Sequence, residues 1–275
     1  MDLALQAIVI GIVQGLTEFL PISSSGHLIV LPYMFGWYDP FLESLPFSVM
    51  LHVGTLGALL VYFWRDWLRL VPAFFATIRD RSFRDDQDRR LAWLIAAATV
   101  PAAIVGFLLN DIIEREIRQV AVVAAALVVG AGILWIADRW GAKTKGLDGL
   151  GFPGALGIGV AQAIALIPGV SRSGISISAG LFLGLTRESA ARFSFLMSAP
   201  IIAGTAVFEA RKLLAGEAGV AIPAVPLALG TLAAFLTGLV AIAFLLGYLR
   251  DHPLTIFVAY RLVLAAIIVV ALLAR

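Results

Sequence analysis

The chain alternates long apolar runs with short polar segments rich in glycine, proline and serine. Charged residues are absent from residues 47–64, 91–109, 119–137, 149–171 and 218–249. A helix needs about 20 apolar residues to cross a hydrocarbon core of about 30 Å. Several of these runs reach that length. The pattern therefore predicts an all-α, polytopic integral membrane protein.

The apolar runs and the turn residues between them predict about ten helical segments. These are residues 3–20, 26–37, 46–64, 91–109, 119–138, 152–167, 174–185, 193–211, 222–248 and 254–273. Most can span a membrane, but 26–37 and 174–185 have only about 12 residues, or roughly 18 Å of helix. Each follows a Pro/Gly/Ser break. Such a break predicts a re-entrant hairpin, because non-helical backbone is tolerated at membrane depth only inside protein or beside a wet cavity.

The two breaks resemble each other in sequence. Residues 11–26 (GIVQGLTEFLPISSSG) and 159–174 (GVAQAIALIPGVSRSG) share Gly, Gln, Ser, Ser and Gly in register, and a Phe-Ser pair follows each. We expect one membrane domain, 1–275, made of a repeat at about 1–140 and a second at about 150–275. Each repeat holds one hairpin and about three spanning helices, so the repeats are inverted and the bundle has about six spans in all. The working site is expected where the broken helices meet.

Composition supports a membrane protein and excludes several chemistries. Hydrophobic residues make up 61% of the chain and charged residues 14%, against about 25% charged in a soluble domain. The mean hydropathy is +0.98. With no Cys, disulfides and thiolate chemistry are excluded, and three His are too few for a histidine-rich metal cage. No nucleic-acid partner is expected.

Basic residues predict the orientation. One side holds Arg65, Arg69, Arg79, Arg81, Arg84, Arg89, Arg90, Arg139, Lys143, Lys145 and Arg250, and the other holds Arg115, Arg118, Arg211, Lys212 and Arg275. We therefore expect the 65–90 loop in the cytoplasm and both termini outside. The loop itself is interpreted as a solvated charged connector rather than a binding patch.

The first break gathers reactive groups. Gln14 and Glu18 lie one helical turn apart on the same face, and Ser23, Ser24, Ser25, Gly26 and His27 follow within ten residues. The break is also the N-terminus of the next short helix, which favours anions. A carboxylate able to hold a divalent cation, a hydroxyl nucleophile and an imidazole base suit the hydrolysis of an activated phosphate. Helix capping by the serines and a structural Glu18–His27 pair are the alternatives.

The second break predicts an anion clamp. Arg172 lies between Ser171 and Ser173, ahead of Gly174 and Ser176. Its guanidinium is a planar fork of donors suited to phosphate, and the serines add hydroxyl donors. An arginine in a glycine-bounded break at membrane depth is hard to explain by packing. We expect this segment to bind the phosphate groups.

Other ionisable residues at membrane depth are less informative. His52 is interpreted as a helix-facing residue with a satisfied hydrogen bond rather than a ligand. Arg187 and Glu188 can be ordinary interfacial residues. Arg261 can line a cavity or pair with a neighbouring carbonyl, and the sequence does not decide between these two.

The two motifs together resemble the undecaprenyl-diphosphate phosphatase family of the bacitracin-resistance type. The resemblance is carried by Gln14, Glu18 and residues 23–27, and by Pro-Gly-Val-Ser-Arg-Ser-Gly at 168–174. It extends over nearly the whole chain. The family implies an enzyme of the bacterial cytoplasmic (inner) membrane that converts undecaprenyl diphosphate into undecaprenyl phosphate and inorganic phosphate. It recycles a carrier lipid for cell-wall synthesis and confers bacitracin resistance.

The resemblance also implies roles for single residues. Glu18 would be the catalytic or metal-associated carboxylate, Ser24 the candidate nucleophile, and His27 the acid/base or alternative nucleophile. Arg172 would hold the diphosphate, and the cofactor would be a divalent cation, Mg²⁺ or Ca²⁺. Gln14 stands where the family often has Glu, which leaves one carboxylate fewer for the cation. The attacking group, Ser24, His27 or water, is left open, as is a homodimer.

Two other classes of protein compete with the enzyme. Inverted repeats with broken helices are also a transporter architecture, so a flippase for the monophosphate lipid is the main alternative. A membrane scaffold would explain neither break. A hydroxyl-rich segment beside a buried carboxylate favours chemistry, because transport alone needs no base next to a hydroxyl.

Overall fold

The computed structural model describes residues 2–83, 86–112, 119–214 and 221–274. Arg84, Arg115, Arg118 and Arg275, which enter the orientation argument, lie outside this part. The helices are α1 (Leu3–Phe19), α2 (Ser24–Phe35), α3 (Leu45–Tyr62), α4 (Trp64–Asp80), α5 (Gln87–Ile112), α6 (Val120–Trp140), η2 (Leu147–Gly149), α7 (Phe152–Ile164), α8 (Arg172–Phe182), α9 (Arg187–Leu214), α10 (Ala224–Asp251) and α11 (Thr255–Leu273).

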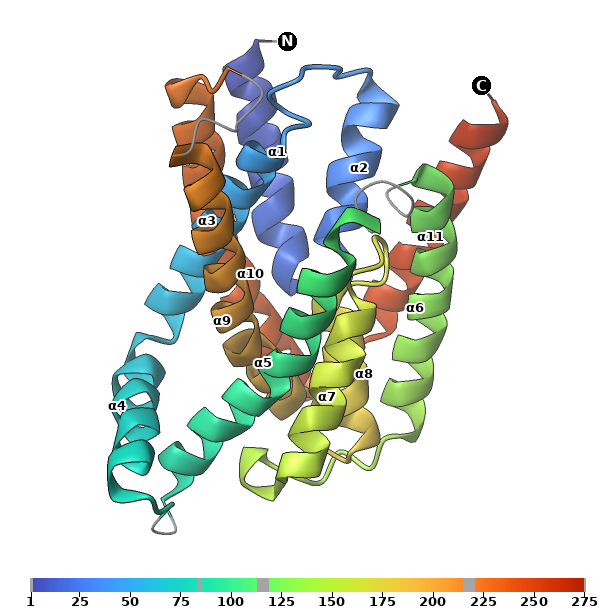
Figure 1. The fold of residues 1–275 in the computed structure, drawn as a ribbon. Coiled ribbons are helices and arrows are strands. Elements are labelled where there is room, and N and C mark those ends of the chain that lie inside the picture. Colours follow the sequence, from blue (N-terminus) through green and yellow to red (C-terminus); the bar gives the residue numbers. More distant parts are fainter. Residues whose placement is uncertain (1, 84–85, 113–118, 215–220, 275) are drawn as a thin grey trace.

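Six helices in the described part are long and apolar enough to cross a membrane, namely α3, α5, α6, α9, α10 and α11. The predicted all-α, polytopic membrane fold is therefore confirmed. The shorter α1 and α2 form one hairpin, and α7 and α8 form another. The first hairpin enters the bundle from the end that carries both termini and the second from the opposite end, so that the two breaks meet near mid-height (Figure 1).

One helix was not expected from the sequence. The 65–90 segment was interpreted as a connector, but residues 64–80 form α4. Its exposed apolar residues Trp64, Leu68, Val71 and Phe75 recur every three to four positions, which is the period of an amphipathic helix. Arginines and aspartates on the other positions make this segment look like a plain charge run when only charge-free stretches are considered.

The two halves of the chain interlock. The first helix of each half packs against a helix from the other half: α1 against α10, and α7 against α5. Glycines allow both contacts, since a Cβ added at Gly11 would lie 2.2 Å from the carbonyl oxygen of Gly230, and one at Gly159 would lie 2.3 Å from that of Ala98. Small residues let membrane helices approach this closely. Gly11 and Gly159 occupy equivalent positions in the two sequence motifs.

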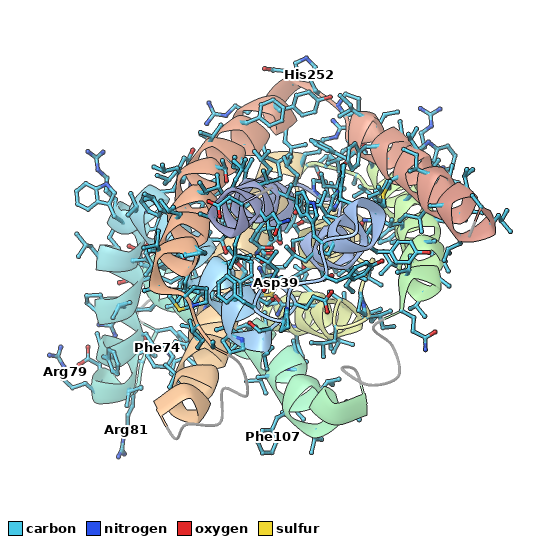
Figure 2. All side chains as sticks on the ribbon, turned by 90° about the horizontal axis from the view of Figure 1, so that it is seen from above. Asp39, Phe74, Arg79, Arg81, Phe107 and His252 are labelled. Atoms are coloured by element: carbon cyan, nitrogen blue, oxygen red, sulfur yellow. The ribbon has the colours of Figure 1, made fainter. Side chains whose placement is uncertain are left out.

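The view from the end with the termini shows what surrounds the centre of the bundle. Large apolar side chains such as Phe107, which is 78% exposed, point outward, as expected for a surface in contact with lipid (Figure 2). Asp39, in the loop between α2 and α3, lies over the middle of the bundle (Figure 2).

Two glycines on α7 provide a matched test of the interlocked packing. Gly159→Ala must push α7 away from α5, and overpacking of this kind costs about 1–3 kcal/mol. Gly157→Ala has no neighbour within 4 Å of the new Cβ, so it should leave stability unchanged or raise it by the helix propensity of Ala. The thermal unfolding midpoints of the two variants in the same detergent measure the difference. Equal midpoints would contradict the close α5–α7 contact.

Candidate active site

The two breaks have the same local structure. Ser23 and Ser171 have φ values of 76° and 73°, a left-handed conformation that is uncommon for residues other than glycine. Each serine accepts a hydrogen bond at its Oγ from the backbone N–H three residues later, of Gly26 at 3.3 Å and of Gly174 at 3.1 Å. The unusual backbone conformation is thus adopted by a serine in each break, and in the second break by Gly169 as well, with φ 97°. Residues held in such backbone regions often lie at functional sites.

Glu18 is the centre of the polar contacts. Its carboxylate is 5% exposed and accepts hydrogen bonds at Oε2 from Gln14 Nε2 at 3.1 Å and from Ser24 Oγ at 2.5 Å. Oε1 forms an ion pair with the guanidinium of Arg172. The structure thus brings together three residues that the sequence predicted for catalysis, although 154 positions separate Glu18 from Arg172.

These groups face a cavity of about 330 Å³. Its polar lining residues are Glu18, Ser24, Ser25, Ser48, His52, Ser171, Arg172 and Thr205. Its apolar lining residues are Leu45, Val49, Ala165, Leu166, Ile201, Ile202 and Ala206. A cavity lined by both charged and aliphatic side chains suits a ligand with an anionic head and a hydrocarbon tail.

His52 is the residue that sequence reasoning missed. It was interpreted as a satisfied helix residue, but its ring lines the cavity with Nε2 3.6 Å from Glu18 Oε2. Its Nδ1 lies 2.8 Å from the carbonyl oxygen of Ser48, one turn earlier in α3. An ionisable side chain inside the charge-free run 47–64 was the available signal. The contact with the Ser48 carbonyl agrees with the expectation that the ring has a hydrogen-bond partner.

The remaining predicted residues lie behind the cavity wall and shape it. Ser173 donates from Oγ to the carbonyl of Leu20 at 3.0 Å, which joins the two breaks. Ser176 is buried. Ser23, Gly26 and Gly174 form the turns described above. None of these five residues is among those that line the cavity, and their contact with substrate stays a prediction.

His27 also lies outside the cavity lining. Its Nδ1 lies 2.7 Å from the carbonyl of Ser23, and its Nε2 lies 2.7 Å from the hydroxyl of Tyr260 on α11. The two rings stack. Both nitrogens are thus held by neighbours behind the break. The predicted acid/base role of His27 stays a prediction, and in this structure its ring contacts Ser23 and Tyr260.

Arg261 pairs with carbonyl groups and does not line the cavity. The side chain is fully buried, and its guanidinium donates to five backbone carbonyls at 2.9–3.3 Å. These belong to Pro21 in the first break, Gly169 and Val170 in the second, and Ala126 and Leu127 in α6. One side chain thus satisfies orphan carbonyls of both broken helices. A side chain on Gly174 would collide with it, since an added Cβ would lie 2.9 Å from Arg261 Nη1.

The other charged residues near the short helix α8 form ion pairs away from the cavity. Arg187 pairs with Asp138 on α6 at 2.5 Å, and Arg192 pairs with Asp66 on α4 at 2.7 Å. Glu188 pairs with Arg250 at 3.0 Å, and both side chains are exposed. These contacts fit the interfacial role considered for Arg187 and Glu188.

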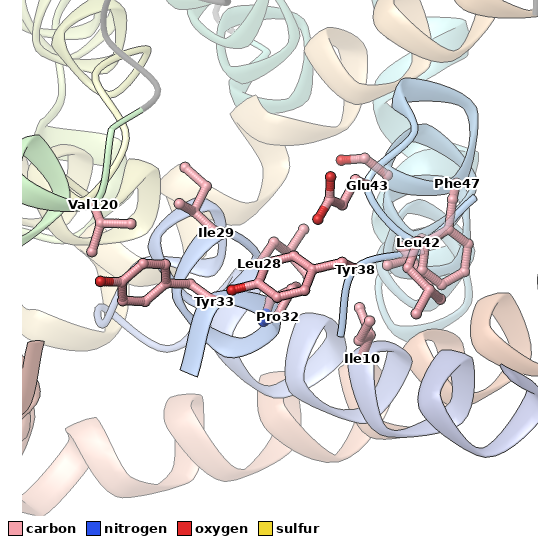
Figure 3. Close-up of a pocket in the computed structure, with 12 residues that line it drawn as sticks. Ile10, Leu28, Ile29, Pro32, Tyr33, Tyr38, Leu42, Glu43, Phe47 and Val120 are labelled. Carbon is pink, nitrogen blue, oxygen red and sulfur yellow. The ribbon is translucent and has the colours of Figure 1, made fainter. Parts of the chain in front are cut away.

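A second cavity of about 380 Å³ lies beside the first. It is bounded by α1, α2, the loop that follows α2, and α3, and Ser48 lines both cavities. Tyr33, Tyr38 and Glu43 bring polar groups to it, while Leu28, Leu42 and Phe47 make it largely apolar (Figure 3). The second cavity is therefore the neighbouring space on the side that carries the termini.

Fold and site together define a polytopic membrane protein with a buried carboxylate, a hydroxyl and a guanidinium at an intramembrane cavity. The family described as "Bacitracin resistance protein BacA" matches residues 7–267. Proteins named undecaprenyl-diphosphatase are 44% identical in Thermomicrobium roseum, with 96% of each chain covered, and 46% identical in Rubrobacter xylanophilus, with 98% of each covered. One from Moorella thermoacetica is 47% identical over 96% of each chain. The chain belongs to the bacitracin resistance protein BacA family.

The carbonyl contacts of Arg261 predict a large effect on stability. Arg261→Lys keeps the charge, but an ammonium has three donors and cannot reach carbonyls in α6 and both breaks together. Hydrogen bonds to charged groups contribute about 1.5–3 kcal/mol each, so we expect a loss of at least about 3 kcal/mol. Arg250→Lys, in an exposed pair worth about 0–1 kcal/mol, is the control. Thermal unfolding in detergent measures both, and similar midpoints would contradict the role of Arg261.

Proposed function

We propose that this protein hydrolyses undecaprenyl diphosphate to undecaprenyl phosphate and inorganic phosphate. The observation that carries the proposal is the placement of Glu18, Ser24 and Arg172 together in the lining of a cavity that aliphatic side chains also line. Membership of the family and the names of its relatives support the same activity. Recycling of this carrier lipid for cell-wall synthesis, and resistance to bacitracin, follow from that reaction.

The electrostatics of the site suit a diphosphate. Ser24 and Arg172 are the first residues of α2 and α8, so two helix N-termini, each favourable to anions, flank the same space. Arg172 adds a full positive charge and a bidentate donor. The diphosphate competes with Glu18 for this guanidinium as it binds. Leu45, Val49 and the isoleucines of α9 receive the first isoprene units of the tail.

The geometry supports Ser24 as the nucleophile. Its Oγ attacks the terminal phosphorus, the bond from that phosphorus to the oxygen of undecaprenyl phosphate breaks, and Glu18 Oε2 takes the hydroxyl proton. Glu18 passes this proton to the departing undecaprenyl phosphate and is a carboxylate again. Water then attacks the phosphoserine and gives a proton to Glu18, the bond from phosphorus to Ser24 Oγ breaks, and Glu18 returns the proton to that oxygen, which releases inorganic phosphate and restores the hydroxyl. Arg172 stabilises the charge that moves onto the leaving oxygen. Ser24 is favoured over His27 because its hydroxyl contacts the carboxylate of Glu18, whereas His27 does not line the cavity.

A divalent cation, Mg²⁺ or Ca²⁺, fits the groups present. Glu18 supplies a carboxylate oxygen, and Gln14 Oε1 is buried without a hydrogen-bond partner. Mg²⁺ is commonly held by one or two carboxylates together with substrate phosphates, which matches a site with one carboxylate. When bound, the cation would neutralise phosphate charge.

We propose that the two halves, about 1–140 and about 150–275, are inverted repeats. The support is the equivalent backbone of Ser23 and Ser171, the equivalent helix contacts of Gly11 and Gly159, and the entry of the hairpins from opposite ends. The two hairpins then differ in function because equivalent positions hold different residues, Ser24 in the first and Arg172 in the second.

The activity test is phosphate release from a polyprenyl diphosphate by purified protein in detergent with Mg²⁺. Arg172→Ala should lower turnover by about 10²–10³, as does the loss of one donor to a developing oxyanion, and Ser24→Ala should lower it at least as much. Arg79→Ala, on the exposed face of α4, should have no effect. No release by the wild type, with lipid movement intact in liposomes, would favour the flippase instead. Near-normal activity of Arg172→Ala would contradict the proposal that Arg172 binds the diphosphate.

We also propose that the site opens, through the second cavity, to the outer side of the cytoplasmic membrane, with the 65–90 segment in the cytoplasm. Because the chain has no cysteine, single cysteines report the orientation. Glu43→Cys should react with a membrane-impermeant maleimide in intact cells, and Gln87→Cys only after permeabilisation; both native side chains are exposed. Labelling in the reverse order would overturn the orientation.

A further inference from the structure

The ring of His52 is held in one orientation at the cavity wall. A carbonyl oxygen only accepts hydrogen bonds, so the 2.8 Å contact with Ser48 requires the proton on Nδ1. In the neutral ring Nε2 then carries the lone pair. It is the Nε2 atom that lies 3.6 Å from Glu18 Oε2.

This arrangement is the one that metal-binding histidines usually show. Such a histidine donates its second ring N–H to a carbonyl or carboxylate, which sets the tautomer and aims the ring at the metal. Two atoms bound at about 2.0–2.2 Å to one ion cannot be more than about 4.4 Å apart. The 3.6 Å between His52 Nε2 and Glu18 Oε2 lies within that limit.

The composition of the site leaves room for a nitrogen ligand. Gln14 contributes an amide where a second carboxylate would hold a cation more strongly, and Glu18 and His52 are the carboxylate and the imidazole among the residues that line the cavity. A neutral imidazole adds a donor without adding charge beside Arg172. Ser24, the substrate and water can complete the coordination.

We infer that His52 is a second protein ligand of the divalent cation, alongside Glu18. This inference rests on the proposed function, because that reaction is the reason for a cation in the cavity. A nitrogen donor favours transition metals over Ca²⁺, which prefers oxygen ligands. The site should therefore bind Mn²⁺ more tightly than its single carboxylate would allow.

The test uses Mn²⁺ as a spectroscopic probe on the purified full-length protein in detergent. Pulsed electron paramagnetic resonance detects a nitrogen coordinated to Mn²⁺, and a titration gives its dissociation constant. We expect a nitrogen signal in the wild type and its loss in His52→Gln. The Mn²⁺ dissociation constant should rise about tenfold or more, and that for Ca²⁺ should change less than about threefold.

The control is His252→Gln, since His252 lies exposed at the end of α10, away from the cavity. It should keep the nitrogen signal and the wild-type affinity. A wild type that shows no nitrogen signal, or a His52→Gln variant that keeps it, would overturn the inference. Phosphate release measured on the same wild-type preparation separates the two proposals. Phosphate release without a nitrogen signal would reject His52 as a metal ligand and keep the proposed phosphatase activity. A His52-dependent signal without phosphate release would support the metal site and reject the phosphatase activity.

Discussion

Non-helical backbone at membrane depth must find hydrogen-bond partners inside the protein, and this constraint organises the whole bundle. Arg261 meets it for both breaks at once, because its guanidinium reaches carbonyls of Pro21, Gly169 and Val170 as well as of α6. Backbone carbonyl dipoles stabilise the buried charge of Arg261, which therefore needs no carboxylate as a partner. This leaves Glu18 available for the cavity. Arg261 therefore has a structural contact with the backbone, whereas the charge of Glu18 faces the cavity.

A pair of similar hairpins has become one asymmetric site. The turns at Ser23 and Ser171 are alike in dihedral angle and hydrogen bonding, so they present the residues that follow them in the same way. Those residues are Ser24 in one hairpin and Arg172 in the other, and both contact the same carboxylate. The shared backbone supplies two helix N-termini, and the different side chains supply a hydroxyl and a guanidinium. The glycine contacts of α1 and α7 hold the hairpins in the interlocked bundle.

Much of this could be predicted from the sequence, because the bilayer makes local patterns decisive. An apolar run of span length has few alternatives to a transmembrane helix, and a Pro/Gly/Ser break before a half-length helix has few alternatives to a re-entrant hairpin. Glu18, Ser24 and Arg172 stood out because ionisable and hydroxyl groups are costly in such segments without a purpose. The helix α4 was missed, although its apolar period is visible, because its charged residues resemble a connector.

The sequence by itself determined the membrane-spanning helices, the two hairpins and the residue types that meet at the breaks, since these follow from hydropathy and local turn chemistry. Only the tertiary structure decided which side chains face one another. In the folded protein His27 contacts Tyr260 and does not line the cavity, His52 of α3 lies beside Glu18, and Arg261 donates hydrogen bonds to the backbone of both breaks. These three are polar residues on apolar helices, and the rotation and packing of each helix set their direction. That depends on contacts between residues far apart in the chain, which local patterns do not record.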